Sequence, residues 1–355
     1  MAASEPGPMP GKGFYKSPVG CVYEVTYRCD NRCEFCYAPL SQSEVARELD
    51  VHSVVRSLID QGLFHIGFSG GEPLLRPEVV DAALVARRER VRTTLITNGT
   101  QIPRVGAARL MEAFNDIQVS LQGPTPEDHD AITGVTGSFQ RALAGIEALV
   151  AEGASFNVNA TLTTRNADSL PALMDLVRTL GGRSFSVTRF CVPSGGDTGG
   201  LSLPPKVFRA IIARCLAHGE AIGVTFAGIL SGIPLCSLGS LILRHRGLAK
   251  GCTCGRYWVD ITPWGGVKTC PPAFEEHGRF DDLAGLWRTD FIRRWQADEF
   301  LPQPCRRCKL VWTCRGGCRS AAHHESGLMD APDPLYPPWA AGGGALSPRV
   351  GRSGT

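Results

Sequence analysis

Residues 21–36, CVYEVTYRCDNRCEFC, combine a run of β-branched and aromatic residues with three cysteines in the spacing C-x3-C-x2-C. The run at 21–27 predicts a β-strand. A second strand pattern, HIGFSG at 65–70, leads into the turn sequence SGGEP at 69–73. In parallel α/β folds the loops after the strands form the active-site face. We therefore expect the cysteines and the glycine turn to lie at one end of a sheet.

The alternation of strand and helix patterns continues to about residue 225. Strand patterns occupy 21–27, 65–70, 93–98, 117–121, 156–162 and 184–190. Helical patterns occupy 49–62, 77–89, 106–114, 138–153, 169–182 and 205–219. This order favours right-handed βαβ crossovers and a parallel sheet. Six units are too few for an eight-fold barrel, so an open doubly wound sheet and an incomplete barrel both fit.

The organisation changes beyond residue 225, where Gly, Pro, Cys and Trp dominate and only 282–297 has a helical pattern. Such a segment has little aliphatic core, so we expect metal sites to hold it together. We predict a flexible arm at 1–18, an α/β core at 19–225, a small irregular cysteine-rich domain at 226–337 and a disordered tail at 338–355.

Composition restricts the compartment and the partners. The 37 basic and 34 acidic residues leave a net charge of +3, too small to indicate a nucleic-acid or membrane partner. Residues 1–18 lack the apolar core of a signal peptide, and no apolar run has the length of a membrane span. We expect a cytoplasmic protein. Disulfides are rare in that compartment, so the 14 cysteines indicate metal ligands.

The first three cysteines allow two kinds of metal site. Cys29, Cys33 and Cys36 fit a four-iron cluster with one open iron, or a zinc site with a remote fourth ligand. The turn at 69–73 favours the cluster. Its two glycines let a ligand approach the backbone closely, and Glu72 with exposed carbonyl groups can hold an ammonium group.

Together, C-x3-C-x2-C after the first strand and GGEP after the second resemble the radical S-adenosylmethionine (radical SAM) superfamily over residues 19–225. The resemblance implies a partial (β/α)6 barrel. It also implies a [4Fe–4S] cluster on Cys29, Cys33 and Cys36, whose open iron is chelated by the methionine group of S-adenosylmethionine (SAM). Reductive cleavage of SAM would yield a 5′-deoxyadenosyl radical that takes hydrogen from the substrate.

The resemblance also implies contacts to SAM. Phe35 would lie against the adenine and Arg189 would meet the carboxylate. Asn98 and Ser120 would contact the ribose or the carboxylate. The ammonium group would be received by Gly70, Gly71, Glu72 and Pro73. Loop packing for Phe35 and turn hydrogen bonds for Asn98 and Ser120 are the structural alternatives.

This chain departs from the family pattern at two positions. Gln122 stands where relatives often have the aspartate of SLDG. Thr133 stands where many relatives have the arginine of D-x-x-R-G.

The C-terminal cysteines have the spacing C-x10-G-x4-C, then C-x2-C-x5-C-x3-C, which resembles the SPASM domain and its auxiliary iron–sulfur clusters. The resemblance assigns Cys252, Cys254, Cys270 and Cys318 to auxiliary cluster I, with Cys236 competing for the place of Cys252. It assigns Cys305, Cys308 and Cys314 to auxiliary cluster II. The remaining cysteines, Cys21, Cys191 and Cys215, are assigned to packing.

The usual last cysteine of auxiliary cluster II is replaced by Tyr336. Four side chains offer a substitute ligand: Tyr336, Asp330, Asp333 and His323. An open site for a substrate group and a degraded or three-iron cluster are the alternatives.

These features together predict an enzyme that oxidatively modifies a ribosomal peptide, by cross-linking or decarboxylation for example. A separate recognition protein, or a leader that binds the barrel mouth, would deliver the peptide, and a flavodoxin or ferredoxin would supply electrons. The alternatives are oxidation or decarboxylation of a small biosynthetic intermediate and, from another class, a non-catalytic zinc- or cluster-binding scaffold. The glycine turn argues against the scaffold, which has no use for an ammonium-binding site.

Overall fold

The computed structural model describes residues 16–38, 47–191, 200–230, 232–245, 248, 251–273 and 275–338. The predicted arm at 1–18 and the predicted tail at 338–355 lie outside these residues, apart from 16–18 and 338.

A single sheet of ten strands organises the molecule, in the order β10-β9-β8-β1-β2-β3-β4-β5-β6-β7. Its strands are β1 Gly20–Glu24, β2 His65–Ser69, β3 Arg92–Thr97, β4 Asp116–Ser120, β5 Asn157–Leu162, β6 Ser184–Arg189, β7 Thr225–Ile229, β8 Trp258–Ile261, β9 Gly266–Lys268 and β10 Gly278–Arg279. Strands β1 to β7 pair in parallel in chain order. Because their order never reverses, the sheet is an incomplete barrel and not a doubly wound sheet.

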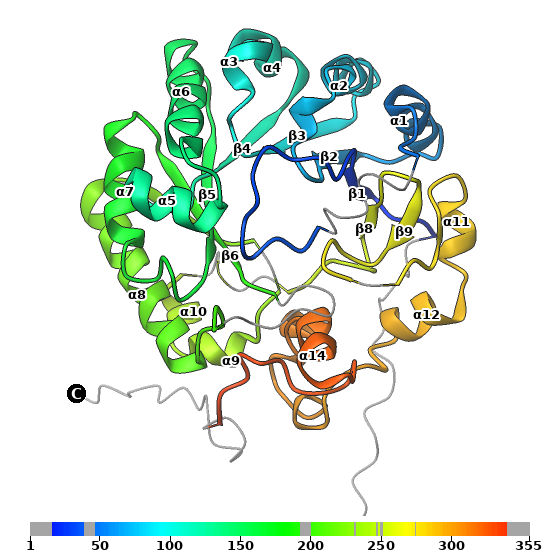
Figure 1. Ribbon diagram of the computed structural model, residues 1–355. Coiled ribbons are helices and arrows are strands. Elements are labelled where there is room, and N and C mark those ends of the chain that lie inside the picture. Colours follow the sequence, from blue (N-terminus) through cyan, green and yellow to red (C-terminus); the bar gives the residue numbers. More distant parts are fainter. Residues whose placement is uncertain are drawn as a thin grey trace, which may run out of the picture.

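Helices cover the outer side of this barrel, with α1, α2, α6, α7 and α8 around it in Figure 1. The helices of the described residues are α1 Val51–Asp60, α2 Glu78–Arg88, α3 Ile102–Val105, α4 Ala107–Ala113, α5 Pro126–Thr133, α6 Ser138–Ala151, α7 Leu170–Thr179, α8 Pro205–Ile222, α9 Leu235–Leu238, α10 Leu241–Arg244, α11 Leu283–Leu286, α12 Asp290–Gln296, α13 Val311–Cys314 and α14 Arg319–Ser326. Local signals fix several ends. Asp50 caps α1 by accepting from the Ser53 N–H, and Gly223 ends α8 in the left-handed conformation.

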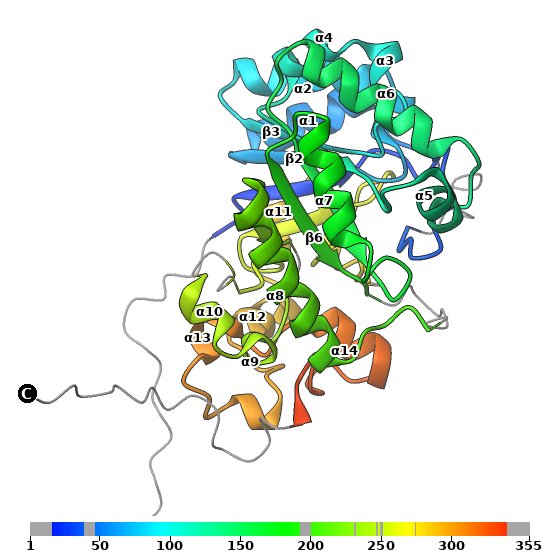
Figure 2. The ribbon, with the colours of Figure 1, turned by 90° about the vertical axis from the view of Figure 1, so that its left-hand side faces the viewer.

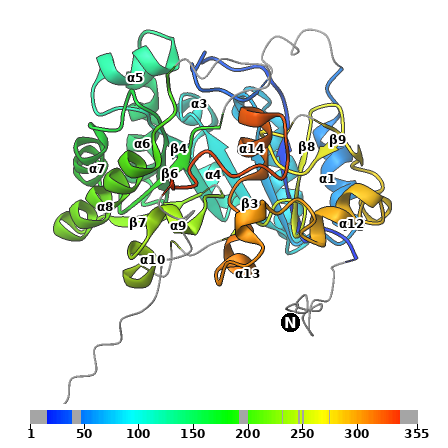
Figure 3. The same cartoon turned by 90° about the horizontal axis from the view of Figure 1, so that it is seen from below.

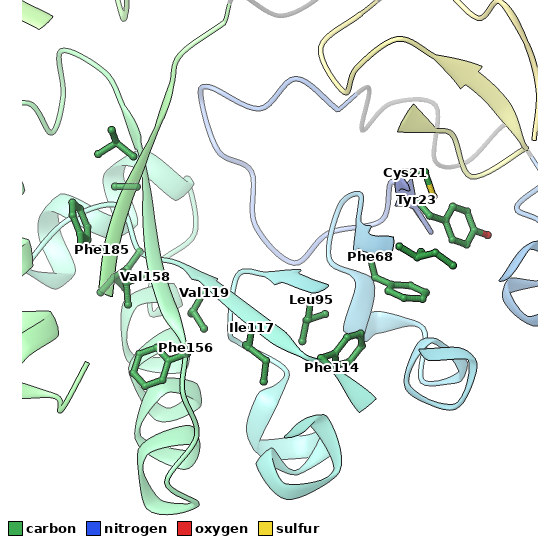
Figure 4. Packing of buried hydrophobic residues seen from close by; sticks show 14 of the residues in the cluster. Cys21, Tyr23, Phe68, Leu95, Phe114, Ile117, Val119, Phe156, Val158 and Phe185 are labelled. Atoms are coloured by element: carbon green, nitrogen blue, oxygen red, sulfur yellow. The ribbon is translucent and has the colours of Figure 1, made fainter. Parts of the chain in front are cut away.

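The hydrophobic core lies between the strands and the helices (Figure 4). On β1, Cys21 and Tyr23 belong to this layer, and the Tyr23 ring is 6.5 Å from that of Phe68. Because side chains alternate along a strand, Val22 and Glu24 face the opposite way, into the barrel.

The cysteine-rich segment is joined to this sheet. Strand β8 pairs in parallel with β1, and β9 runs antiparallel to β8. Three buried side chains on the inner face connect these strands, namely Glu24, Asp260 and Lys268. Lys268 Nζ lies 3.0 Å from Glu24 Oε2 and 2.9 Å from Asp260 Oδ2. The cluster ties the C-terminal segment to the first strand of the core.

The predicted strands and helices up to α8 are confirmed within a few residues, but the C-terminal half differs. Strand β7 continues the parallel order beyond the predicted core. The single helix expected at 282–297 is two short helices, α11 and α12. The helices α9, α10, α13 and α14, and α3 and α5 in the first half of the chain, were not predicted. Most of these helices are about one turn long, too short to produce a recognisable apolar period. Figure 2 shows α9, α10 and α13 gathered near one end of α8.

Candidate active site

The glycine turn is packed directly against the backbone that precedes the first cysteine. The N–H of Gly71 donates to Thr26 O at 2.7 Å, and that of Glu72 donates to Arg28 O at 2.9 Å. A Cβ added at Gly70 would collide with Thr26 O, and one at Gly71 would lie 2.7 Å from the Arg28 carbonyl carbon. The close approach therefore requires glycine at both positions.

Glu72 is fully buried and joins this turn to the end of β3. Its Oε1 accepts from the Leu74 N–H at 3.0 Å and from the Thr97 hydroxyl at 2.7 Å, while Oε2 accepts from the Asn98 N–H at 2.8 Å. Burial raises the pKa of this carboxyl to about 7, against the lowering effect of these hydrogen bonds. Glu72 thus positions the loops, and its contact with an ammonium group stays a prediction.

A second network holds the cysteine loop to the loop after β3. Asp30 accepts from Asn98 Nδ2 at 2.7 Å, the Thr100 hydroxyl at 2.6 Å and Gln101 Nε2 at 2.9 Å. Burial acts to raise the pKa of Asp30, but these hydrogen bonds outweigh it and leave the pKa below its usual value. Asn98 Oδ1 also accepts from the Thr100 N–H at 3.0 Å. The turn hydrogen bond considered for Asn98 is therefore present.

The C-terminal end of α5 supports the loop from another side. The N–H groups of Arg32 and Glu34 donate to Thr133 O at 2.8 Å and to Ile132 O at 3.1 Å. Thr133, which stands where many relatives have arginine, places its hydroxyl 2.6 Å from that of Ser138 at the start of α6. The loop is therefore held by the glycine turn, the loop after β3 and α5.

The three cysteines of this loop, Cys29, Cys33 and Cys36, form the barrel set. The Asn31 N–H donates to Cys29 Sγ at 3.4 Å. Burial raises the pKa of Cys29 to about 12 and that of Cys33 still further, and the neighbouring barrel-set thiols add to both effects. Bound metal cations would be needed to hold such thiols as thiolates.

The other predicted SAM contacts occupy different environments. Phe35 is half-buried on the cysteine loop, and Ser120 is half-buried at the end of β4. Arg189 is engaged elsewhere, because its Nη1 lies 2.8 Å from both carboxylate oxygens of buried Asp333. Gln122 has a structural role, since its side-chain oxygen accepts from the Thr161 N–H at 2.9 Å. The SAM contacts of Phe35, Ser120 and Arg189 stay predictions.

Four cysteines of the C-terminal segment form set I: Cys252, Cys254, Cys270 and Cys318. Hydrogen bonds to Cys252 and Cys270 hold the pKa of the Cys254 thiol well above its usual range. The Ala321 N–H at the start of α14 donates to Cys318 Sγ at 3.4 Å. Cys191, assigned to packing from the sequence, lies against Cys318 and lowers the pKa of that thiol by donating a hydrogen bond. Figures 1 and 3 show α14 between β6 and β8, on the open side of the barrel.

The remaining predicted ligands, Cys305, Cys308 and Cys314, form set II near the N-terminal end of α9. The Leu235 N–H donates to Cys314 Sγ at 3.2 Å. Burial and then the Cys314 thiol raise the pKa of Cys305 to about 11, with a smaller contribution from Cys308. Burial is the largest cause that raises the pKa of Tyr336. The thiols of Cys236, Cys305 and Cys308 raise it further, in that order, so Tyr336 lies near these cysteines.

Known proteins resemble this chain in sequence and in fold. A model of the radical SAM superfamily matches residues 23–177. The PqqA peptide cyclase of Ruegeria pomeroyi is 30% identical over 342 residues, which cover 90% of this chain and 87% of the cyclase. The chain belongs to the radical SAM superfamily. The mycofactocin maturase MftC of Mycobacterium ulcerans is 30% identical over 338 residues, covering 90% of this chain and 87% of the maturase. Streptococcus suis SuiB bound to precursor peptide SuiA shares the fold, with a TM-score of 0.72 and 18% identity, over 91% of this chain and 75% of SuiB.

This radical SAM enzyme uses a [4Fe–4S] cluster and SAM, and the barrel set fits that cluster. Three thiols lie on one anchored loop at the carboxyl end of β1, with a backbone N–H already directed at one sulfur. Within the described ranges, no group of three or more His, Cys, Asp or Glu side chains is arranged to hold a metal ion. A cluster does not require such convergence, because each thiolate binds its own iron.

Among the helices of these ranges, none is long and apolar enough to cross a bilayer.

Two groups that build the site were not predicted from the sequence. Asp30 was passed over because an aspartate within a loop gives no signal of its partners. Glu24, Asp260 and Lys268 were missed because their strands are separated in the chain, although their alternation places all three on the inner face. Polar residues at inward positions of otherwise apolar strands are the signal that would have found them.

Proposed function

We propose that this radical SAM enzyme oxidatively modifies a peptide. The observation that supports this most strongly is the likeness over 90% of the chain to a protein named PqqA peptide cyclase. The second relative, a mycofactocin maturase, matches an equal share of the chain. Both likenesses extend beyond the barrel, so they include the segment that contains sets I and II.

The chain's own residues would bind and orient the reactants. The barrel set would hold the [4Fe–4S] cluster, and the turn at 70–73 would place the methionine end of SAM beside it. When bound, these groups supply the 5′-deoxyadenosyl radical that takes hydrogen from the substrate. Glu72 and Asp30 fix the loops to one another through the hydrogen bonds described above, so both ligand-bearing loops keep one geometry.

Sets I and II would hold auxiliary iron–sulfur clusters within the domain proposed at 226–337. Set I fits an anionic cluster, because three arginines, Arg256, Arg315 and Arg319, line the hollow beside Cys252 and Cys254 with one carboxylate, Asp298, which pairs with the first two. Such clusters would accept the electron left after hydrogen abstraction or bind a substrate thiolate. An external flavodoxin or ferredoxin would reduce the barrel cluster, and a separate recognition protein would deliver the peptide. The cysteine-rich composition supports a cytoplasmic location.

The test is co-expression of the chain with the short peptides encoded beside its gene, followed by mass spectrometry of each peptide. The proposal predicts a peptide that loses hydrogen or carbon dioxide with the wild type but not with the Cys29→Ala/Cys33→Ala/Cys36→Ala variant. If no peptide changes and 5′-deoxyadenosine forms only with a small-molecule fraction, oxidation of a small biosynthetic intermediate is the function instead.

A further inference from the structure

A cysteine outside the spacing pattern lies beside set II. Cys236 is the second residue of α9, and the residue before it donates its N–H to Cys314 Sγ at 3.2 Å. Cys314 Sγ also lies 3.9 Å from Ile233 O. A Cβ added at Gly317 would lie 2.9 Å from the nitrogen of Pro234, so the segment 233–235 packs against Cys314 and the turn that follows it.

We propose that Cys236 is the fourth ligand of the second auxiliary cluster and completes set II in place of the cysteine that Tyr336 replaces. The inference rests on the proposed function, because it requires set II to hold a cluster. It also settles the competition between Cys236 and Cys252 for a place in set I, because it leaves that place to Cys252.

Backbone contacts along this segment agree with the placement. A Cβ added at Gly232 would lie 3.2 Å from Cys252 Cβ and 3.7 Å from its Sγ, so position 232 lies beside set I. Three residues further on, the N–H of Leu235 reaches Cys314 Sγ of set II. Cys236 follows Leu235 directly, so it begins on the set II side of the segment.

Two of the other substitutes for the missing ligand, Asp333 and Tyr336, fit less well. Both oxygens of buried Asp333 are occupied, because Oδ1 accepts from the Leu335 N–H at 2.7 Å, Oδ2 from the Cys318 N–H at 2.6 Å, and both from Arg189. Tyr336 lies near the same thiols as Cys236. Iron–sulfur clusters are ordinarily held by four thiolates, and soft thiolate is preferred over phenolate oxygen. The set completed by Cys236 has that composition.

The test is the iron content and electron paramagnetic resonance spectrum after anaerobic reconstitution of the whole chain. We expect about twelve irons per wild-type chain, as three four-iron clusters require. Cys236→Ala should retain about eight irons, or about eleven with the signal of a three-iron cluster. Tyr336→Phe should keep the wild-type iron content and spectrum. Cys215→Ala, which alters a cysteine buried in α8, is the matched control for loss of a thiol.

Two results would overturn the inference. One is a Cys236→Ala chain with wild-type iron content and spectrum, and the other is loss of cluster II iron in Tyr336→Phe instead. Circular dichroism and retention of the other two clusters show whether Cys236→Ala has folded, and Cys236→Ser provides a milder variant. A wild-type chain with about eight irons would remove cluster II and this inference together. The radical SAM activity would still stand if that chain forms 5′-deoxyadenosine.

Discussion

The contact between the glycine turn and the cysteine loop can be tested by one methyl group. In Gly71→Ala, the new Cβ would lie 2.7 Å from the Arg28 carbonyl carbon and 2.9 Å from that of Tyr27. Carbon atoms prefer separations of about 3.5–4.0 Å, so one of the two loops must move by about 1 Å. Overpacking of this kind costs about 1–3 kcal/mol of stability. A misplacement of about 1 Å at a reacting centre can reduce the rate by about 100-fold.

The assay is the anaerobic formation of 5′-deoxyadenosine from SAM and dithionite, expressed per barrel cluster. We expect Gly71→Ala to be slower than wild type by about 100-fold. Gly67→Ala is the matched control in the strand before the turn, because its Cβ would have its nearest neighbour, Cys21 O, at an ordinary 3.6 Å. If the two variants cleave SAM at rates within about twofold of each other, the close approach does not position the site.

Three further predictions concern buried charges. Asp333→Ala removes the carboxylate that contacts the buried Arg189 guanidinium. It should lower the free energy of unfolding in urea by about 3–5 kcal/mol, and adding Arg189→Met should recover much of that loss. Equal stability of the single and double variants would contradict this prediction. Burial raises the pKa of Glu72 from 4.5 to about 7. The folded chain therefore holds the proton of Glu72 more tightly than the unfolded chain does. About 3 kcal/mol of stability is present below pH 4.5 and is lost as the pH rises from 4.5 to about 7. Glu72→Gln should flatten that part of the pH profile. Lys268→Met leaves two buried carboxylates without their cation, and should cost about 3–5 kcal/mol; an unchanged melting temperature would refute it.

The sequence was sufficient to predict the barrel strands and the site-bearing loops. Each strand from β1 to β6 is a compact run of β-branched and aromatic residues, followed by a helix with a clear apolar period. The cysteine loop and the glycine turn follow successive strands that pair in parallel. Residues at the ends of such neighbours must lie close together, so the order of the two motifs along the chain is enough to predict their proximity.

The C-terminal half was less predictable because its geometry comes from long-range contacts. Nothing in the local sequence indicates that Asp333 pairs with Arg189, which lies 144 residues earlier. The pairing of β8 with β1 depends in the same way on distant residues, and β8 is only four residues long. The side of the molecule on which Cys236 lies is set by the packing of 233–236 against Cys314. Spacing identifies paired cysteines but not the neighbours of an isolated one.

The most direct test of the central claim is the yield of 5′-deoxyadenosine from SAM for reconstituted wild type and for the Cys29→Ala/Cys33→Ala/Cys36→Ala variant. The account predicts that the wild type forms 5′-deoxyadenosine. The variant should form none while it keeps about eight irons, the content of two auxiliary clusters. Equal yields from both proteins, or no product from a wild type that contains its full iron, would contradict the assignment of the barrel set as the site of SAM cleavage.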